Sequence, residues 1–207
     1  MALILGIETS TLNCSVALAQ GGEVLSLRQE NSDRYIHSET LHLFIQQVMQ
    51  EAQLAVADVL EAVAVGKGPG SYTGLRIGVS AAKGLCYALN LPLISEDGLQ
   101  ILVKDFLGRQ PIEKGDIIIP MLDARRMEVY YAPHQSDGKR LGDIKAKVIA
   151  ENSFQDLEAP KVHLIGDRAE KCKEVLKDPR FVFHPLAFPS ARALAGISSS
   201  EISKRAI

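Results

Sequence analysis

Short apolar runs alternate along the first half of the chain with segments whose apolar residues recur at helical spacing. Apolar runs of four to eight residues are typical of strands, and apolar residues three and four positions apart are typical of helices. A Gln-Gly-Gly turn follows the second apolar run, so the chain opens with an antiparallel meander. The predicted elements are, in order, the strands 3–8, 14–19 and 23–29, the helix 37–53, the strand 62–65, the helix 73–89, the strand 92–95 and the helix 99–107.

The second half of the chain repeats this order of elements. It predicts strands at 117–123, 128–132 and 145–149, a short helix near Phe154, a strand at 162–165, a helix at 168–176, a strand at 181–183 and a helix at 190–205. The order βββαβαβα therefore occurs twice, and an internal duplication says more about the architecture than any single element. The first strand of each half ends on an acid, Glu8 in one and Asp123 in the other.

A polar break at residues 108–115 separates the two halves and predicts lobes at 1–110 and 111–207. Two duplicated α/β lobes that face each other across a cleft are typical of actin and the sugar kinases. The expected fold class is therefore α/β and actin-like (ASKHA), with two lobes of mixed sheets flanked by helices. The chain ends at Ile207, directly after the last predicted helix, and the sequence leaves open whether a few C-terminal residues of the natural protein follow.

The composition excludes several classes of protein. The 207 residues are 46% hydrophobic with a net charge of −2, which suits a globular protein and gives no overall positive excess for binding nucleic acid. Residues 121–180 hold twelve of the 23 basic groups, but eleven acids offset them, so no phosphate-binding track is predicted. Three well-separated cysteines favour buried thiols over disulfides or a zinc site. Without a basic leader or an apolar run of about 20 residues, we expect a cytoplasmic protein that binds no membrane.

In actin-like proteins the turn after the first strand of each lobe binds phosphate groups. Such turns need glycine or small hydroxyl residues, because the backbone must approach the anion closely. The first turn, at residues 6–11, reads GIETST, and Thr9 and Ser10 are its candidate anion contacts.

The corresponding turn of the second lobe has lost its glycine. Residues 122–127 read LDARRM, so only the side chains of Arg125 and Arg126 remain as candidate anion contacts. The purine-binding turn of that lobe is reduced to residues 165–167. Two of the three nucleotide-binding turns have therefore lost the residues typical of them. This predicts that the fold is kept and that kinase activity is lost.

Residues 66–78, with the sequence GKGPGSYTGLRIG, form the most distinctive run in the chain. They are not a Walker A loop, because no Gly-Lys-Ser/Thr closes the run ahead of the helix. Either Ser71 or Thr73 can cap the helix that follows.

Within that helix Gly74, Gly78 and Ala82 recur every four residues, so one stripe carries almost no side chain. A glycine inside a helix costs about 1 kcal/mol relative to alanine, and close approach of another backbone is the usual compensation. Two alternatives remain open: packing inside the same lobe, or a helix–helix interface with another protein that is shared with the helix 37–53. Gly74→Leu or Gly78→Leu would separate them, because an interface mutant stays folded without its partner and a core mutant unfolds.

No catalytic or metal-binding group is predicted. His37 and His42 are five residues apart, about 500° of helical rotation, so they do not share the face that a metal pair requires. Asp123 lies where superfamily kinases place a general base, but Arg125 and Arg126 beside it make an ion pair an equal alternative.

Three segments together resemble one family. Residues 4–10, 66–78 and 121–130, with the strings GPGSYTGLRIG and DARRMEVY, are similar to the bacterial tRNA threonylcarbamoyladenosine biosynthesis family TsaB, also called YeaZ. The resemblance covers nearly the whole chain, and Tyr72 is a minor departure where the family often has Phe. It implies a non-catalytic paralogue of TsaD, the subunit that transfers threonylcarbamoyl to adenosine 37 of tRNAs that read ANN codons. TsaD-like subunits hold a metal through a His-x-x-x-His pair, which this sequence lacks.

The resemblance also implies partners. Family members bind TsaD through the first two long helices of the N-terminal lobe, self-associate by that face when TsaD is absent, and assemble further with the ATPase TsaE. The chain would reach tRNA only indirectly, through the complex. No cofactor of its own is expected, and a nucleotide at the interface with the partner is the one cofactor left open. Transposed to this chain, the partner interface comprises Leu41, Ile45, Val48, Gly74, Leu75, Gly78 and Ala82.

Two enzyme classes are the alternatives. A small-molecule kinase or ATPase of the same superfamily would bind Mg-ATP at micromolar concentration, which calorimetry can test. A peptidase would need a metal or a nucleophile–base pair, and no such arrangement stands out in the sequence.

Overall fold

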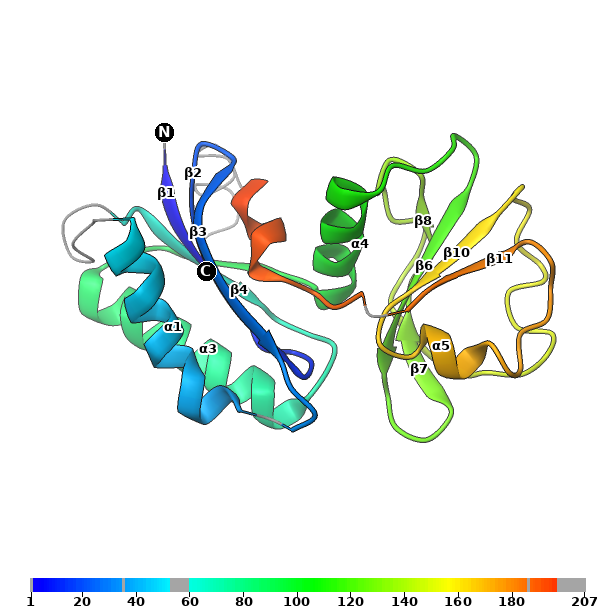
Figure 1. Cartoon of the computed structure of the whole chain (residues 1–207), viewed down its shortest axis with the longest axis horizontal. Helices are drawn as coiled ribbons and strands as arrows, with labels where there is room; N and C mark the ends of the chain where they lie inside the picture. Colours follow the sequence, from blue (N-terminus) through cyan, green and yellow to red (C-terminus); the bar gives the residue numbers. More distant parts are fainter. Residues whose placement is uncertain (1, 35, 53–59, 186, 197–207) are drawn as a thin grey trace. The chain divides into compact units, whose positions relative to one another are not determined.

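The computed structural model of the chain describes residues 2–34, 36–52, 60–185 and 187–196. The chain, drawn in Figure 1, divides into two compact units. The first unit comprises Met1–Ile101 and Ser190–Ile207, and the second comprises Leu102–Pro189.

The first unit is built on a five-stranded sheet with the order β3-β2-β1-β4-β5. β1 (Leu3–Glu8), β2 (Asn13–Gln20) and β3 (Glu23–Asn31) form the predicted antiparallel meander. β4 (Ala62–Gly66) and β5 (Leu93–Glu96) continue the sheet parallel to β1. All six residues of β1 are buried, because this central strand is covered on both faces.

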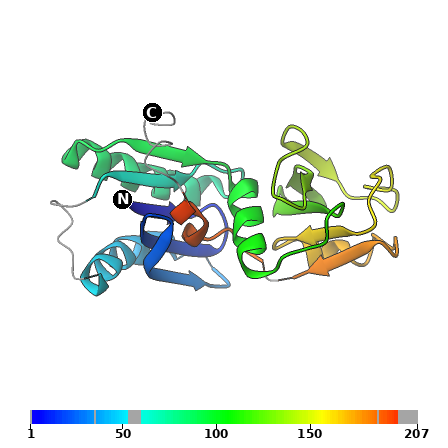
Figure 2. The ribbon, with the colours of Figure 1, turned by 90° about the horizontal axis from the view of Figure 1, so that it is seen from above.

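Different elements cover the two faces of this sheet. α1 (His37–Glu51) and α3 (Tyr72–Leu89) pack on one face, and η1 (Ala191–Gly196) packs on the other (Figure 1, Figure 2). Successive residues of a strand point to opposite faces. The odd-numbered residues of β1 therefore join the core under α1 and α3, whereas Ile4 joins a second core with Leu194 of η1.

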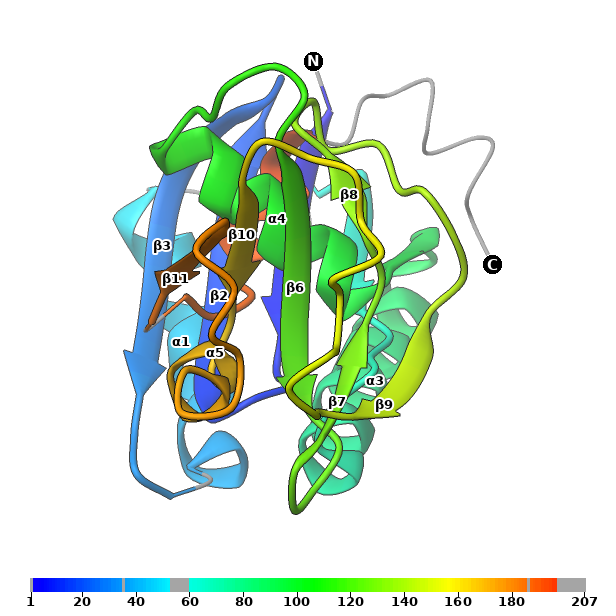
Figure 3. The same ribbon diagram turned by 90° about the vertical axis from the view of Figure 1, so that its right-hand side faces the viewer.

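The second unit contains a six-stranded sheet with the order β11-β10-β6-β7-β9, and β8 pairs with β6 (Figure 3). β10 lies parallel to β6 and β11, while β7 runs antiparallel to β6 and β9, so this sheet is also mixed. The strands are β6 (Ile117–Asp123), β7 (Glu128–Tyr131), β8 (His134–Gln135), β9 (Lys145–Val148), β10 (Val162–Ile165) and β11 (Phe181–His184).

Helical elements also flank this second sheet. α5 (Ala169–Cys172) belongs to the main core of the unit, together with alternate residues of β6 and β10. α4 (Gly98–Arg109) spans the division between the two units, and its Phe106 packs against His163 of β10 and His184 of β11.

The predicted order of elements is confirmed for the first half, and every predicted strand is present in both halves. Three predictions in the second half were wrong in detail. The helix expected near Phe154 is a series of turns, because Phe154 takes a left-handed backbone (φ 66°) and buries its ring against Tyr131. The helix predicted over 168–176 is a single short turn, and β8 was not predicted. Of the last predicted helix, 190–205, the described part is the 3₁₀ helix η1, and residues 197–205 lie outside the described residues, as does Gln53.

The division of the chain differs from the predicted lobes 1–110 and 111–207. The segment that begins at Ser190 belongs to the first unit, where the Ser190 hydroxyl donates to Gln29 Oε1 (2.8 Å). The Ala191 amide donates to Ser15 Oγ (3.0 Å) in the same unit. Composition along the chain marks where a segment ends, but it does not reveal that a later segment returns to an earlier sheet.

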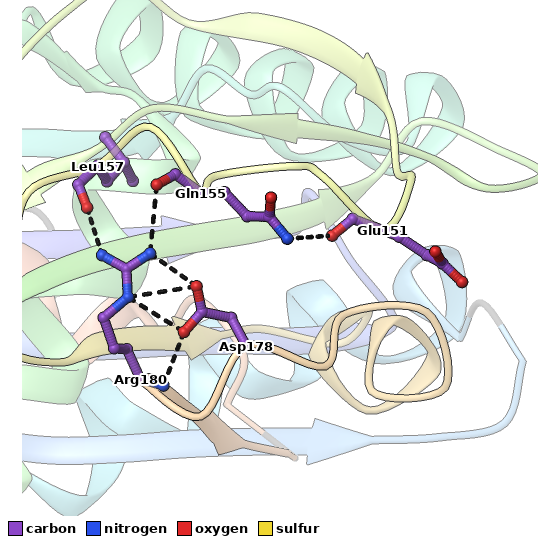
Figure 4. A network of polar contacts seen from close by, with 5 residues as sticks. All are labelled: Glu151, Gln155, Leu157, Asp178 and Arg180. Atoms are coloured by element: carbon purple, nitrogen blue, oxygen red, sulfur yellow. Dashed lines mark hydrogen bonds and ion pairs between the residues drawn. The ribbon is translucent and has the colours of Figure 1, made fainter.

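Arg180 anchors the turns that replace the predicted helix (Figure 4). Its guanidinium donates to the carbonyl oxygens of Leu157 (2.6 Å) and Gln155 (3.2 Å) and forms an ion pair with Asp178 (2.6 Å). The planar fork of arginine makes all these bonds at once, which the single ammonium of lysine does not.

We therefore expect Arg180→Lys to loosen the turns at residues 151–157 without unfolding the unit. Hydrogen–deuterium exchange should show faster exchange there than in the wild type, with unchanged protection in β6 and β10. Lys171→Ala, at an exposed site of α5, is the control and should leave exchange at 151–157 unaltered. Equal exchange in Arg180→Lys and the wild type would contradict the anchoring role.

Candidate functional site

The turn between β1 and β2 is the first candidate site, and it is tied to the two helices beneath it. Thr9 Oγ1 donates to the carbonyl of Gly74 (2.9 Å) at the start of α3, and the Ser71 amide donates to the carbonyl of Ser10 (2.7 Å). His37 Nε2, at the start of α1, donates to the carbonyl of Thr9 (3.1 Å) and also lies 2.8 Å from the carbonyl of Thr11. The turn is therefore held to both helices by its own carbonyl oxygens and by the Thr9 hydroxyl.

The glycines of the run 66–78 make this close approach possible. A Cβ atom on Gly74 would lie below 3.0 Å from the carbonyl oxygen of Thr9, and one on Gly78 would lie equally close to Thr9 Oγ1. A Cβ on Gly70 would collide in the same way with the backbone of Ser10. Ser71 caps α3 by accepting a hydrogen bond from the Gly74 amide (3.2 Å), which confirms one of the two predicted caps. The run thus seats α3 against the hairpin of its own unit.

This geometry decides between the two alternatives for the small-residue stripe in favour of internal packing. Leu41, Ile45 and Val48 of α1 are likewise buried in the core of the first unit. The prediction that these residues form a partner-binding surface is therefore wrong for six of the seven positions, and Leu75 alone is partly exposed. The six buried positions are Leu41, Ile45, Val48, Gly74, Gly78 and Ala82.

The exposed side of α3 instead carries large side chains. Tyr72 and Tyr87 are 72% and 92% exposed, and Arg76 stacks over the Tyr72 ring at 5.4 Å. At 100° per residue, Tyr72, Arg76, Lys83 and Tyr87 fall within about 60° of one another around the helix. This outer stripe, Tyr72–Arg76–Lys83–Tyr87, faces away from the glycine stripe.

The predicted anion contacts Thr9 and Ser10 are not presented to a ligand. Their side chains are 0% and 1% exposed, and the Ser10 amide already donates to Glu8 Oε1 (2.6 Å). Burial raises the pKa of the Glu8 carboxyl, and its Oε2 has no hydrogen-bond partner among the described residues. An internal carboxyl group thus occupies the Ser10 amide, which is not available to an anion in this structure.

The turn between β6 and β7 forms the second candidate site. Arg125 and Arg126 both take left-handed backbone conformations, with φ of 79° and 54°. Such conformations cost roughly 1–2 kcal/mol in a residue with a Cβ. The Arg125 amide donates to Asp123 Oδ1 (2.9 Å), and both arginine side chains are exposed. Their predicted role as anion contacts through side chains stays a prediction.

Asp123 is an ion-pair residue, but with a different arginine from the two expected. It pairs with Arg168, which follows the turn after β10. Next to this pair, burial raises the pKa of Asp167 to about 6, with Arg168 lowering it and Asp123 raising it. Two carboxyl groups around one guanidinium form a fixed charge cluster, and no nucleophile–base pair is bonded within it.

Sequence reasoning missed a hydrogen-bonded chain of Asp116, His163 and His184 in the second unit. Asp116 Oδ2 lies 3.0 Å from His163 Nε2, and His163 Nδ1 lies 2.9 Å from His184 Nε2. The three residues come from three different strands or strand ends, so no local motif could have revealed them. His184 lines a cavity of about 300 Å³, while His163 and Asp116 line another of about 500 Å³.

Two further properties concern the described part of the chain only. No three His, Cys, Asp or Glu side chains gather there to hold a metal ion. In the same residues, no helix combines the length and apolar character needed to cross a bilayer.

Comparison with known proteins identifies a matching family model and several similar proteins. Residues 31–200 match the family model described as TsaD: tRNA N6-adenosine threonylcarbamoyltransferase. The tRNA threonylcarbamoyladenosine biosynthesis protein TsaB of Escherichia coli is 34% identical over 134 residues, which cover 65% of this chain and 55% of that protein. TsaB of Buchnera aphidicola is 29% identical over 207 residues, covering 98% of this chain and 95% of that protein. A solved structure of YeaZ from Pseudomonas aeruginosa has a TM-score of 0.83 and 25% identity, covering 99% and 93% of the two chains.

Two mixed sheets flanked by helices and related by duplication define an actin-like α/β protein, as the sequence predicted. The chain belongs to the family of the tRNA N6-adenosine threonylcarbamoyltransferase TsaD. Within that family its similarity to TsaB, also called YeaZ, confirms the predicted resemblance. The chain spans about half the length of several curated relatives that it matches, at 55%, 52% and 55% of their residues.

Proposed function

We propose that this chain is a non-catalytic subunit in the biosynthesis of threonylcarbamoyladenosine in tRNA. The observation that supports the proposal is the first hairpin, where Glu8 occupies the Ser10 amide and where Thr9 and Ser10 are buried. In the second unit the corresponding turn has arginines and no glycine. A family member whose phosphate-binding turns have changed is better suited to support a catalytic paralogue than to catalyse a reaction by itself.

The proposed partner is a TsaD-type subunit, which would modify adenosine 37 of tRNAs that read ANN codons. The relatives' names and the match to the TsaD family model support this pathway. A TsaE-like ATPase is proposed to join the assembly, and the chain is proposed to self-associate when TsaD is absent. Any nucleotide would bind at the interface with the partner, because the Ser10 amide of the first hairpin already donates to Glu8.

We assign the partner-binding surface to the outer stripe of α3, in place of the buried residues predicted from the sequence. Tyr72 and Tyr87 expose large amphipathic rings at either end of the stripe, and Leu43 of α1 is 54% exposed. Exposed tyrosines with arginine beside them are typical of residues that dominate binding energy in protein interfaces.

Co-expression with the TsaD-like protein of the same source tests the proposal. The wild-type chain should purify as a stoichiometric complex, and Tyr87→Arg should weaken it by at least about 30-fold, as for an interface hot spot. Leu25→Arg, which alters an exposed apolar residue on β3, is the matched control and should bind like the wild type. Absence of a wild-type complex would reject the proposed function, whereas equal binding of both variants would reject only the assigned surface.

The competing function is a small-molecule kinase of the actin-like superfamily. Isothermal calorimetry of the isolated chain with Mg-ATP distinguishes the two. We expect no binding at micromolar concentration, because the Ser10 amide is already bonded. Micromolar binding together with phosphoryl transfer to a small acceptor would overturn the non-catalytic assignment.

A further inference from the structure

The balanced charge of the second half of the chain hides a local asymmetry. Several of its acids are neutralised by basic groups close to them in space: Asp123 pairs with Arg168, Asp178 with Arg180, and Glu170 with Lys173. Each of these three pairs removes one acid and one base, so nine bases and eight acids of residues 121–180 remain outside them, and their positions decide where charge accumulates.

Four such basic groups gather at one end of the sheet of the second unit. Arg125 and Arg126 form the tip of the β6–β7 hairpin, and Lys145 and Lys147 lie on β9 beside it. We call these four residues the basic hairpin patch. Among the described residues, none of the four side chains forms an ion pair.

The pairing of the strands places the two lysines on the strand next to the hairpin. β9 pairs with β7, so that Lys147 lies opposite Val129 and Lys145 opposite Tyr131 (Figure 3). The Ile149 amide donates to the carbonyl of Met127 (3.0 Å), which fixes the end of β9 against the hairpin tip. At the rise of an extended strand the patch spans roughly 15 Å.

The hairpin tip is held rigidly in an unusual backbone conformation. The Ala124 amide donates to the carbonyl of Glu128, and the Glu128 amide donates to the carbonyl of Arg125, each at 3.1 Å. These bonds, with that from the Arg125 amide to Asp123, keep two consecutive arginines in the left-handed region. Strained backbone that the surroundings maintain is concentrated at functional sites, and here it projects two guanidinium groups into solvent.

We propose that the basic hairpin patch contacts the phosphate backbone of the tRNA directly. This inference rests on the proposed function and goes beyond it, because the family resemblance leads to contact with tRNA only through the partner. Arg125, Arg126 and Lys145 are exposed, whereas the Lys147 ammonium lies 5.2 Å from the centre of the Phe154 ring. A short line of exposed arginine and lysine side chains fits successive phosphates of a nucleic-acid strand. The hairpin contains two acids, and Asp123 is paired with Arg168, so Glu128 is left against the four basic groups and the patch keeps a net positive charge.

The test removes the arginines without disturbing the turn. Glycine adopts left-handed conformations freely, so the double variant Arg125→Gly/Arg126→Gly should fold at least as well as the wild type. Binding of a fluorescently labelled tRNA transcript to the complex with the TsaD-like partner is followed by anisotropy at several salt concentrations. The affinity should fall by about tenfold, and the slope of log K against log salt should decrease by about 1 to 2 units.

A matched control separates this site from a general charge effect. Lys139→Ser/Lys171→Ser removes the same two charges from exposed positions of the same unit and should leave the affinity and the slope nearly unchanged. Equal effects of the two double variants, or no effect of the arginine variant, would overturn the proposal. If the wild-type chain forms no complex, the proposed function fails, and the same titration with the isolated chain still decides whether the patch binds RNA.

Discussion

Replacement of Gly74 by alanine should destabilise the first unit by roughly 3 kcal/mol, which is the upper range for overpacking a core. The new Cβ atom would lie below 3.0 Å from the carbonyl oxygen of Thr9. That oxygen has little freedom to move, because it also accepts a hydrogen bond from His37 and belongs to a hairpin bonded to Ser71. A loss of this size is a large fraction of the 5–15 kcal/mol that stabilises a typical domain.

The same helix offers a control variant that should raise the stability of the protein. Gly84 is exposed, and a Cβ built on it meets no atom within 4 Å. Gly84→Ala should therefore stabilise the protein by about 1 kcal/mol, because alanine has the higher helix propensity. Urea unfolding of both variants measures the two changes. If Gly74→Ala kept wild-type stability and lost only its partner, the internal packing described above would be incorrect.

Asp116→Ala should destabilise the second unit by about 2–4 kcal/mol, because it removes the acceptor of one buried and one partly buried donor. Asp116 accepts from His163 Nε2 (3.0 Å) and from the Lys161 amide (3.2 Å), and its side chain is nearly inaccessible. His163 would then lose the group that fixes the orientation of its ring toward His184. Asp143→Ala, at an exposed position of the same unit, should change the stability by less than about 0.5 kcal/mol.

The histidine chain also gives the stability of the protein a pH dependence. Burial, and then the neighbouring His163, lower the pKa of His184 below its ordinary value of 6.5. A histidine with a lowered pKa in the folded state resists protonation there. Its contribution to the free energy of unfolding is therefore complete above pH 6.5 and is lost as the pH falls through the folded-state pKa.

The difference between the wild type and His184→Gln isolates this contribution. His37 also has a pKa lowered by burial, and it contributes in the same direction in both proteins. Free energies of unfolding measured between pH 5 and 8 should therefore decrease less steeply toward acid in His184→Gln. Parallel curves would show that His184 titrates alike in the folded and unfolded states.

Local patterns in the sequence predicted much of this fold. The compact apolar run at residues 3–8 predicted the central strand, and the turn after residue 19 predicted the meander. The glycine-free sequence of the second hairpin predicted that its phosphate contacts had changed. These features depend on residues close together in the chain, whose spacing directly reflects strand and helix geometry.

The sequence did not reveal which neighbour packs against a given face of an element. The recurrence of Gly74, Gly78 and Ala82 identified a bare stripe, but the spacing is the same whether the stripe meets its own hairpin or another protein. Likewise, a nearly equal count of acids and bases did not reveal that Asp123 pairs with Arg168 and not with the neighbouring Arg125 or Arg126.

The sequence by itself thus determined the order of elements in the first half, the strands of both halves, the family and the lack of a glycine in the second hairpin. Only the tertiary structure decided that Glu8 occupies the Ser10 amide, that η1 returns to the first sheet, and that Asp116, His163 and His184 form one chain. The physical reason is that periodicity records which residues share a face, whereas the neighbour that covers this face is set by packing between segments distant in sequence.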